Sequence, residues 1–352
     1  MEVDTKEQSY EKLLDLIKSG QIANIELALE IGKHYPEMQE KLEAYRKFYW
    51  VVFGEKIVEL TAKHLQALTQ VEKLSLSESG LVCLPPEVDI LVNANKFIID
   101  ETRLSVISNE IGRLPRLKKL AIADSELKVL PDTITQLRLE GLGVPGNCLT
   151  ALPTTIGDIQ SIRSIDVSDN LLISLPESIG HLTQLYLLYA RHNNLRALPK
   201  AVGQLTNLAI LEADFNQLRE LPADFAKLHN LWDLSLGNNL FEGIPDQIYA
   251  LKNIEKLSLY QNHFQFVPQK LFQLPKLRSL VLESCKIEHI EFAPGCSPNL
   301  ANLDLSVNKI EEIPASIQYL KGLKELNLRD NPLSSDQVAQ VRQWLPNCEV
   351  LF

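Results

Sequence analysis

A repeat of 23 residues constrains this chain more than any other feature. From residue 71 onward the pattern L-x-x-L-x-L-x-x-N-x-L-x-x-L-P-x-x-I-x-x-L-x-x recurs, and we number its positions 1 to 23. Position 1 is occupied by Val71, Ala94, Leu117, Leu139, Ile162, Leu185, Leu208, Leu231, Ile254, Leu277, Leu300 and Leu323. The step from Leu117 to Leu139 has 22 residues, and every other step has 23. Such a period predicts twelve stacked units rather than separate globular domains.

Each unit is predicted to contain one short strand and one turn. Positions 4 and 6 are apolar between polar neighbours, as in Leu234-Ser235-Leu236, which is the pattern of a strand with one buried face. Leu at position 14, Pro at 15 and Ile or Val at 18 end the strand and favour a helical turn on the opposite side. The tenth unit carries Glu291 to Pro298 in place of this turn, so we expect a loop there.

Asparagine at position 9 is predicted to be structural. It recurs at Asn147, Asn170, Asn193, Asn216, Asn239, Asn262, Asn308 and Asn331, and is replaced by Ser79, Thr102, Ser125 and Cys285. The chain turns inward at this position and would otherwise bury unpaired carbonyl groups, to which a side-chain amide can donate. A ligand or metal ladder is the weaker alternative.

These motifs resemble the leucine-rich-repeat family. The LxxLxLxxNxL core followed by LPxxI, over residues 71 to 333, is similar to the 23-residue repeats of intracellular Ras-suppressor-like and bacterial proteins. The resemblance implies an α/β fold, a right-handed leucine-rich-repeat solenoid (horseshoe) with a concave parallel sheet. It also implies a binding scaffold of bacterial type, but it does not identify the ligand.

Both ends of the array require a cap, because an open stack exposes its first and last cores. Apolar spacing in residues 1–70 predicts a helical N-terminal cap, with the segments Tyr49–Phe53 and Ile57–Val58 as possible leading strands. At the other end, residues 334–352 predict a helix opened by Ser334 and Gln337, followed by a strand.

Charge and cysteine use narrow the class of partner and the compartment. A net charge of −10 disfavours binding to nucleic acid or to an anionic membrane. The N-terminal residues lack the apolar segment of a signal peptide, and the five cysteines are scattered without a CxxC pair. We therefore expect a cytoplasmic monomer.

Catalytic and cofactor motifs are weak. Gly141 to Gly146 matches G-x-G-x-x-G, but the repeat places Leu142 and Val144 inside a strand, and no helix follows. A Ser-His-carboxylate set could be drawn from Asp166, His192 and Ser235, but without an evident oxyanion hole. The histidines lack metal-ligand spacing. We expect no enzymatic activity, no cofactor and no metal.

The concave face carries the best functional signal, because the fold does not dictate its side chains. Large aromatic and charged residues cluster there in units six to nine: Tyr186, Tyr189, Arg191, His192, Glu212, Asp214, Phe215, Trp232, Asp233 and Tyr260. Aromatic residues mixed with arginine are typical of interaction hot spots. The alternative is a solvated surface on which Arg191 pairs only with Asp214.

We therefore predict a non-catalytic scaffold that binds an unidentified protein partner near units six to nine. Two alternatives stay open. The chain could be the substrate-recognition module of a larger signalling or effector enzyme, or a glycan-binding solenoid whose aromatic rings stack on sugars.

Overall fold

The computed structural model describes residues 6–77 and 80–352, so Ser79 lies outside the described residues. The chain divides into two compact units, Met1–Leu149 and Thr150–Phe352.

The first unit opens with four helices within its described residues: α1 (Lys6–Lys18), α2 (Ile22–Gly32), α3 (Pro36–Phe53) and α4 (Ala62–Thr69). The predicted helical cap is thus confirmed. It is fixed to the first repeat by Asp89, which is 2% exposed. The Asp89 carboxylate lies 2.7 Å from Lys18 Nζ of α1 and accepts a 3.5 Å hydrogen bond from the Tyr45 hydroxyl of α3.

The expected leading strands are wrong. Tyr49 to Phe53 form the last turns of α3, which ends at Gly54 with φ 70°, and Ile57 and Val58 lie in an irregular segment. The physical reason is the helical spacing of Tyr45, Phe48 and Tyr49, which buries all three on one face. This burial prevails over the strand propensity of the aromatic and β-branched residues that follow.

Parallel strands follow the helices of the first unit. They are β1 (Lys73–Ser77), β3 (Lys96–Asp100), β5 (Lys119–Ala123) and β6 (Gly141–Gly143) in one sheet, and β2 (Cys83–Leu84) with β4 (Val106–Ile107) in a second. The short 3₁₀ helices η1 (Pro86–Ile90), η2 (Asn109–Arg113) and η3 (Asp132–Gln136) form the return segments. Lys119 pairs with Gly141, which confirms the 22-residue step.

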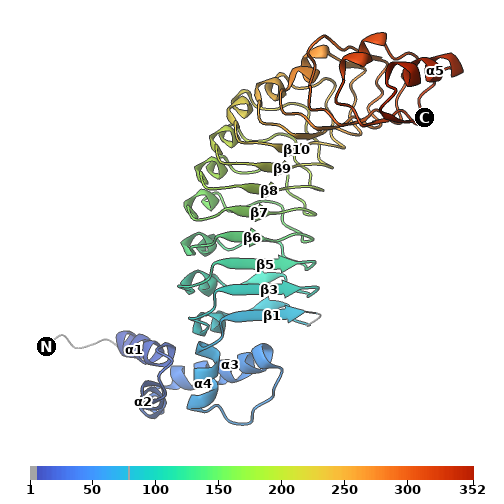
Figure 1. Cartoon of the computed structure of the whole chain (residues 1–352). Coiled ribbons are helices and arrows are strands. Elements are labelled where there is room, and N and C mark those ends of the chain that lie inside the picture. Colours follow the sequence, from blue (N-terminus) through green and yellow to red (C-terminus); the bar gives the residue numbers. More distant parts are fainter. Residues whose placement is uncertain (1–5, 78–79) are drawn as a thin grey trace. The chain divides into compact units, whose positions relative to one another are not determined.

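The second unit repeats the same layout (Figure 1). Its main strands are β7 (Ser164–Asp166), β8 (Leu187–Tyr189), β9 (Ile210–Glu212), β10 (Asp233–Ser235), β11 (Lys256–Ser258), β13 (Ser279–Val281), β15 (Asn302–Asp304), β16 (Glu325–Asn327) and β17 (Glu349–Leu351). The 3₁₀ helices are η4 (Ile156–Asp158), η5 (Glu177–His181), η6 (Lys200–Gln204), η7 (Ala223–Lys227), η8 (Asp246–Ala250), η9 (Gln269–Gln273) and η10 (Ala315–Tyr319). Leu188, Leu211, Leu234 and Leu257 are register partners at a spacing of 23 and are 0 to 1% exposed. The leucine-rich-repeat fold class is confirmed.

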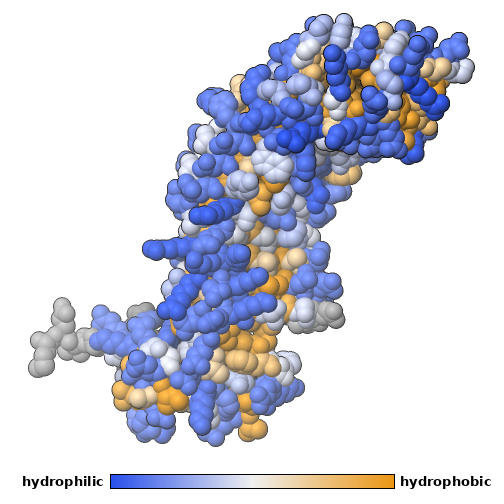
Figure 2. All heavy atoms as spheres, in the orientation of Figure 1, coloured by the Kyte–Doolittle hydropathy of each residue, from blue (hydrophilic) through white to orange (hydrophobic). Residues whose placement is uncertain are grey.

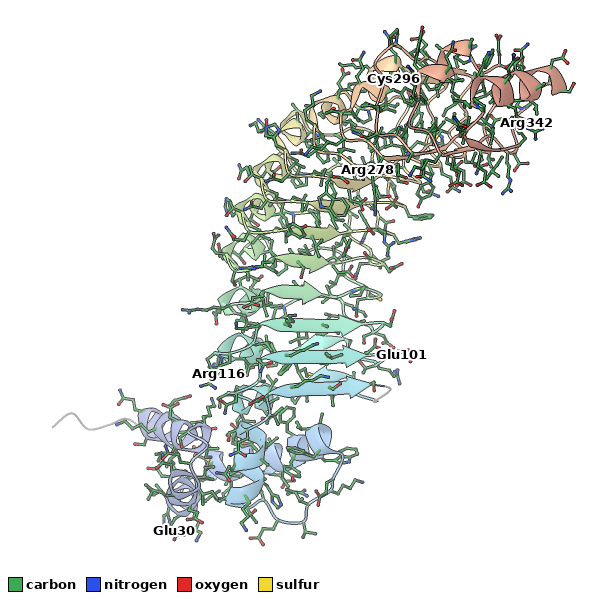
Figure 3. The ribbon with its side chains drawn as sticks, in the orientation of Figure 1. Glu30, Glu101, Arg116, Arg278, Cys296 and Arg342 are labelled. Carbon is green, nitrogen blue, oxygen red and sulfur yellow. The ribbon has the colours of Figure 1, made fainter. Side chains whose placement is uncertain are left out.

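The tenth repeat unit departs from this layout as predicted. The strands β12 (Phe266–Val267) and β14 (His289–Ile290) pair with each other, and a loop follows β14. Cys296, labelled in Figure 3, lies in this loop. Ser297 holds the loop to the preceding repeat, because its hydroxyl donates to the carbonyls of Phe272 and Leu274 at 2.7 and 3.1 Å.

Helix α5 (Ser335–Trp344) begins after Ser334, whose hydroxyl accepts a hydrogen bond from the Gln337 backbone. The Gln337 side chain accepts a 3.1 Å hydrogen bond from the Ile313 backbone, which fixes α5 to the preceding repeat. Strand β17 then pairs with β16, with Val350 opposite Leu326. The inward leucine of β16 is thereby covered, and Leu326 is 0% exposed.

The asparagine ladder is confirmed as structural. Asn216 Nδ2 donates to the carbonyls of Ala190, Ala213 and Asp214 at 2.9 to 3.1 Å, and its oxygen accepts from the Leu195 backbone at 2.9 Å. A second ladder was not predicted. Asn207, Asn230 and Asn253 donate to backbone carbonyls 24 residues earlier, at 2.8, 2.8 and 2.6 Å.

Candidate functional site

The side of strands β8 to β11 that faces away from the leucine core, here called the open face, carries most of the predicted site residues. The strand register sets them in rows. Tyr189, Glu212, Ser235 and Ser258 form one row, and Leu187, Ile210, Asp233 and Lys256 form another. All of these residues belong to the second unit.

Three rings form a continuous aromatic row just beyond the strand ends. The rings of His192 and Phe215 are stacked, with centroids 4.0 Å apart and an interplanar angle of 11°. Phe215 meets Tyr260 edge to face at 6.0 Å and 66°. The predicted residues His192, Phe215 and Tyr260 are therefore brought together, and we call them the aromatic row.

The backbone is left-handed at two of the three residues of the aromatic row. His192 and Phe215 have φ values of 49° and 54°. Wherever the structure describes position 8 in the other units, it has the same conformation, so the repeat itself imposes it. This conformation suits glycine and is uncommon for a bulky side chain such as Phe. The backbone requirement of the fold therefore does not explain Phe215.

Gly237 makes room for Tyr260. A Cβ atom at Gly237 would lie 2.0 Å from Tyr260 Cε1, so the ring lies directly over this glycine. The Tyr260 hydroxyl hydrogen bonds with Asp214, one strand beyond Gly237. Burial and the charge of Asp214 raise the pKa of Tyr260 to about 12. The orientation of this ring is therefore fixed by two neighbouring strands.

Asp214 lies beneath the surface. It is 3% exposed, and its carboxylate accepts hydrogen bonds from Ser235 Oγ at 2.5 Å and from the Gly237 backbone at 2.9 Å. The ion pair considered between Arg191 and Asp214 does not form. Arg191 Nε instead lies 3.3 Å from Glu212 Oε2, because Glu212, at 27% exposure, is more accessible than Asp214.

A second ion pair joins strands β10 and β11. Lys256 Nζ is 3.6 Å from Asp233 Oδ2 and 5.5 Å from the centre of the Trp232 ring. Sequence reasoning missed Lys256. The signal was available, because Lys256 is 23 residues after Asp233 and hence its register partner.

The carboxylates of Glu212 and Asp233 are held in an environment that disfavours their charge. The pKa of Glu212 is raised, mainly by burial and also by the nearby carboxylates. The positive charge of Arg191 opposes this shift. Burial likewise raises the pKa of Asp233 against the opposing effect of Lys256. Burial and the surrounding carboxylates also raise the pKa of Tyr189.

These groups surround a depression of about 300 Å³. Its lining includes seven predicted residues: Arg191, His192, Glu212, Asp214, Phe215, Asp233 and Tyr260. Lys256, Ser258 and Val281 also line it and were not predicted, and Ser235, considered from the sequence only for a catalytic set, lines it as well. Tyr186, Tyr189 and Trp232 lie outside the lining, and Tyr186 is 48% exposed. In the view of Figure 2 the repeats show a largely hydrophilic surface interrupted by apolar side chains.

The Ser-His-carboxylate set that the sequence analysis considered and disfavoured is not assembled. The His192 ring stacks on Phe215, and the Ser235 hydroxyl donates to Asp214. The glycine motif lies where the repeat predicted, with Leu142 at the centre of β6 and 2% exposed. Neither feature has the geometry that its motif requires.

The first unit holds a larger cavity that sequence reasoning also missed. It measures about 860 Å³ and is lined by residues that include Tyr10, Tyr35, Glu37, Glu40 and Lys41 of the helical cap. Among the described helices, none is long and apolar enough to cross a membrane.

Comparison with known proteins agrees with this architecture. A leucine-rich-repeat family model matches residues 229–287. The chain is similar to the probable inactive serine/threonine-protein kinase roco10 of Dictyostelium discoideum, with 28% identity over 116 residues. That match covers 32% of this chain and only 4% of the kinase.

Two solved structures show the same fold. An internalin (inlF) from Listeria monocytogenes is 17% identical, with 88% of this chain and 87% of that chain covered and a TM-score of 0.70. The plant peptide hormone receptor RGFR1, in complex with RGF2, is 26% identical, with a TM-score of 0.62. The match covers 77% of this chain and 46% of the receptor. The repeat pattern, the stacked strands and these matches agree: the chain contains leucine-rich repeats and has the leucine-rich-repeat fold.

Proposed function

We propose that this protein is a non-catalytic interaction scaffold that binds a partner protein on the open face of β8 to β11. The observation that carries the proposal is the aromatic row beside the depression. The repeat demands none of its side chains, and Phe215 occupies a backbone conformation that favours glycine. Large rings packed against partly buried charges are typical of binding hot spots.

The comparisons support a binding role in general terms. Leucine-rich repeats commonly mediate protein–protein interaction, and the similar plant receptor is a peptide hormone receptor in complex with RGF2. The similarity to a small part of a much longer inactive kinase supports a second candidate, in which this chain is the recognition module of a larger protein. Both candidates use the same surface.

Photo-crosslinking tests this proposal. The chain carries p-benzoylphenylalanine at position 215, and a control chain carries it at position 319. Tyr319 is 38% exposed and lies in η10, outside the sheet. After irradiation in the native cell, we expect a protein adduct at position 215 that is absent at position 319. Equal adducts at both positions, or a carbohydrate adduct alone at position 215, would contradict the proposal.

A further inference from the structure

We infer that the depression on the open face receives a cationic side chain of the partner, so that the partner presents a basic segment containing arginine or lysine. This inference rests on the proposed function and adds the chemistry of the ligand. It is carried by the charges around the depression, by their existing partners and by the aromatic walls.

The depression and its immediate surroundings contain more carboxylates than cations. Asp166, Asp214 and Asp233 act electrostatically on Glu212, and Asp214 also acts on Asp233, whereas Arg191 and Lys256 are the cations of the lining. Within the lining, the three carboxylates of Glu212, Asp214 and Asp233 against these two cations leave an excess of one negative charge. A surface with this balance attracts a cation and repels an anion.

The two resident cations do not satisfy this excess. Arg191 pairs with Glu212, and Lys256 pairs with Asp233, so each cation compensates one carboxylate. Asp214 is held by a hydroxyl, a backbone amide and a phenol, which are neutral donors. Its negative charge is therefore buried without a cation among the ion pairs of the described residues.

The environment of Glu212 agrees with this charge balance. Burial and the charges of Asp214, Asp233 and Asp166 raise its pKa despite the nearby Arg191. The negative form is thus undercompensated in the free protein. A cation from the partner would stabilise it, whereas an apolar side chain would remove water from these carboxylates without replacing it.

The walls of the depression suit a cation as well. Phe215 and Tyr260 meet edge to face at 6.0 Å, and both line the depression. Aromatic faces attract guanidinium and ammonium groups, and more strongly as water is removed. A volume of about 300 Å³ accommodates one such side chain, rather than a folded element of the partner. The remaining contacts would then come from the surrounding open face.

Fluorine NMR with a defined probe tests the inference. The full chain carries 4-fluorophenylalanine at position 215 and is titrated with N-acetyl-arginine amide. We expect a saturable shift of the fluorine signal. N-acetyl-citrulline amide, which has nearly the same shape but no charge, should produce little shift. The response to arginine should weaken as salt is added, because exposed charges are screened.

Two variants and one control position complete the design. Glu212→Gln and Asp233→Asn should each weaken the arginine response, by about tenfold for a loss of roughly 1.4 kcal/mol. Circular dichroism checks that both variants fold. A chain with 4-fluorophenylalanine at position 307 in place of position 215 should not respond, because Val307 lies outside the depression.

An equal response to arginine and citrulline, or no response to either, would overturn the cationic ligand. The proposed function would fail differently, through the loss of a specific protein adduct at position 215. If that adduct forms while arginine gives no shift, the scaffold proposal stands and the cationic inference fails.

Discussion

Two regions of the second unit share a backbone but differ in what they present. In one, the aromatic row lies just beyond the ends of β8, β9 and β11; in the other, β15 and β16 carry polar residues that hydrogen bond across the strands, Asn302 with Glu325 and Asn327 with Asp304. Phe215 and Val307 occupy the same repeat position, with φ values of 54° and 55°. Asn216 and Asn308, one residue later, each bind three carbonyls. The backbone conformation and the asparagine hydrogen bonds are therefore the same in both regions. A difference in function must come from the side chains that the repeat does not specify.

The largest expected effect is common to both regions. Asn216→Ala and Asn308→Ala should each lower the free energy of unfolding by about 3 kcal/mol, because each leaves several buried backbone groups unpaired. Urea unfolding followed by circular dichroism measures the loss. A large effect in one region and none in the other would show that the asparagine hydrogen bonds do not stabilise the two regions in the same way.

Gly237→Ala should affect the aromatic row alone. Its new methyl group would collide with the Tyr260 ring, at a cost of about 1–3 kcal/mol, and should displace the ring from Asp214. We expect the crosslink at position 215 to weaken in this variant. Gly243→Ala is the matched control, because a Cβ there meets nothing within 4 Å. Equal behaviour of the two variants would contradict the assigned role of Gly237.

The smallest expected effect concerns pH. The pKa of Glu212 is raised above its ordinary value of 4.5 by burial, so folding favours the protonated form. This contribution to stability is fully present below the unfolded pKa and is lost as pH rises through the folded pKa. Glu212→Gln should therefore reduce the fall in stability as pH rises above 4.5.

Glu110 provides a control of opposite sign, because a hydrogen bond from Ser108 lowers its pKa. Its contribution is present above the unfolded pKa and is lost as pH falls through the folded pKa. Glu110→Gln should therefore flatten the acid side of the stability profile. Thermal unfolding between pH 3 and pH 7 measures how the stability of each variant depends on pH. The same change in both variants would contradict the opposite pKa shifts of Glu212 and Glu110.

The sequence predicted the repeated part of the fold because one period specifies every unit. The spacing of Leu188, Leu211 and Leu234 predicts both the buried face and the register. The N-terminal cap has no such repetition. Tyr49 to Phe53 suit either a strand or a buried helix by composition, and only packing against the other helices decides between them.

The sequence predicted where the residues of the candidate site lie, but not which of them contact one another. The repeat placed Arg191, Glu212 and Phe215 on one face, and the structure confirms that placement. Sequence alone did not choose between Glu212 and Asp214 as the partner of Arg191, because the choice depends on Ser235 and Gly237 holding Asp214 below the surface. The position of the Tyr260 ring over Gly237 could not be predicted either, because a repeat pattern does not specify the direction of a side chain.

The most direct test of the scaffold proposal compares Phe215→Gly with Val307→Gly. Both substitutions relieve the same left-handed backbone, so both should preserve folding, as circular dichroism can verify. The quantity to measure is the yield of the partner identified by crosslinking, captured from lysate on each variant and on the unsubstituted chain. We predict that Phe215→Gly loses the partner and that Val307→Gly retains it. Retention of the partner by a folded Phe215→Gly variant would contradict the account.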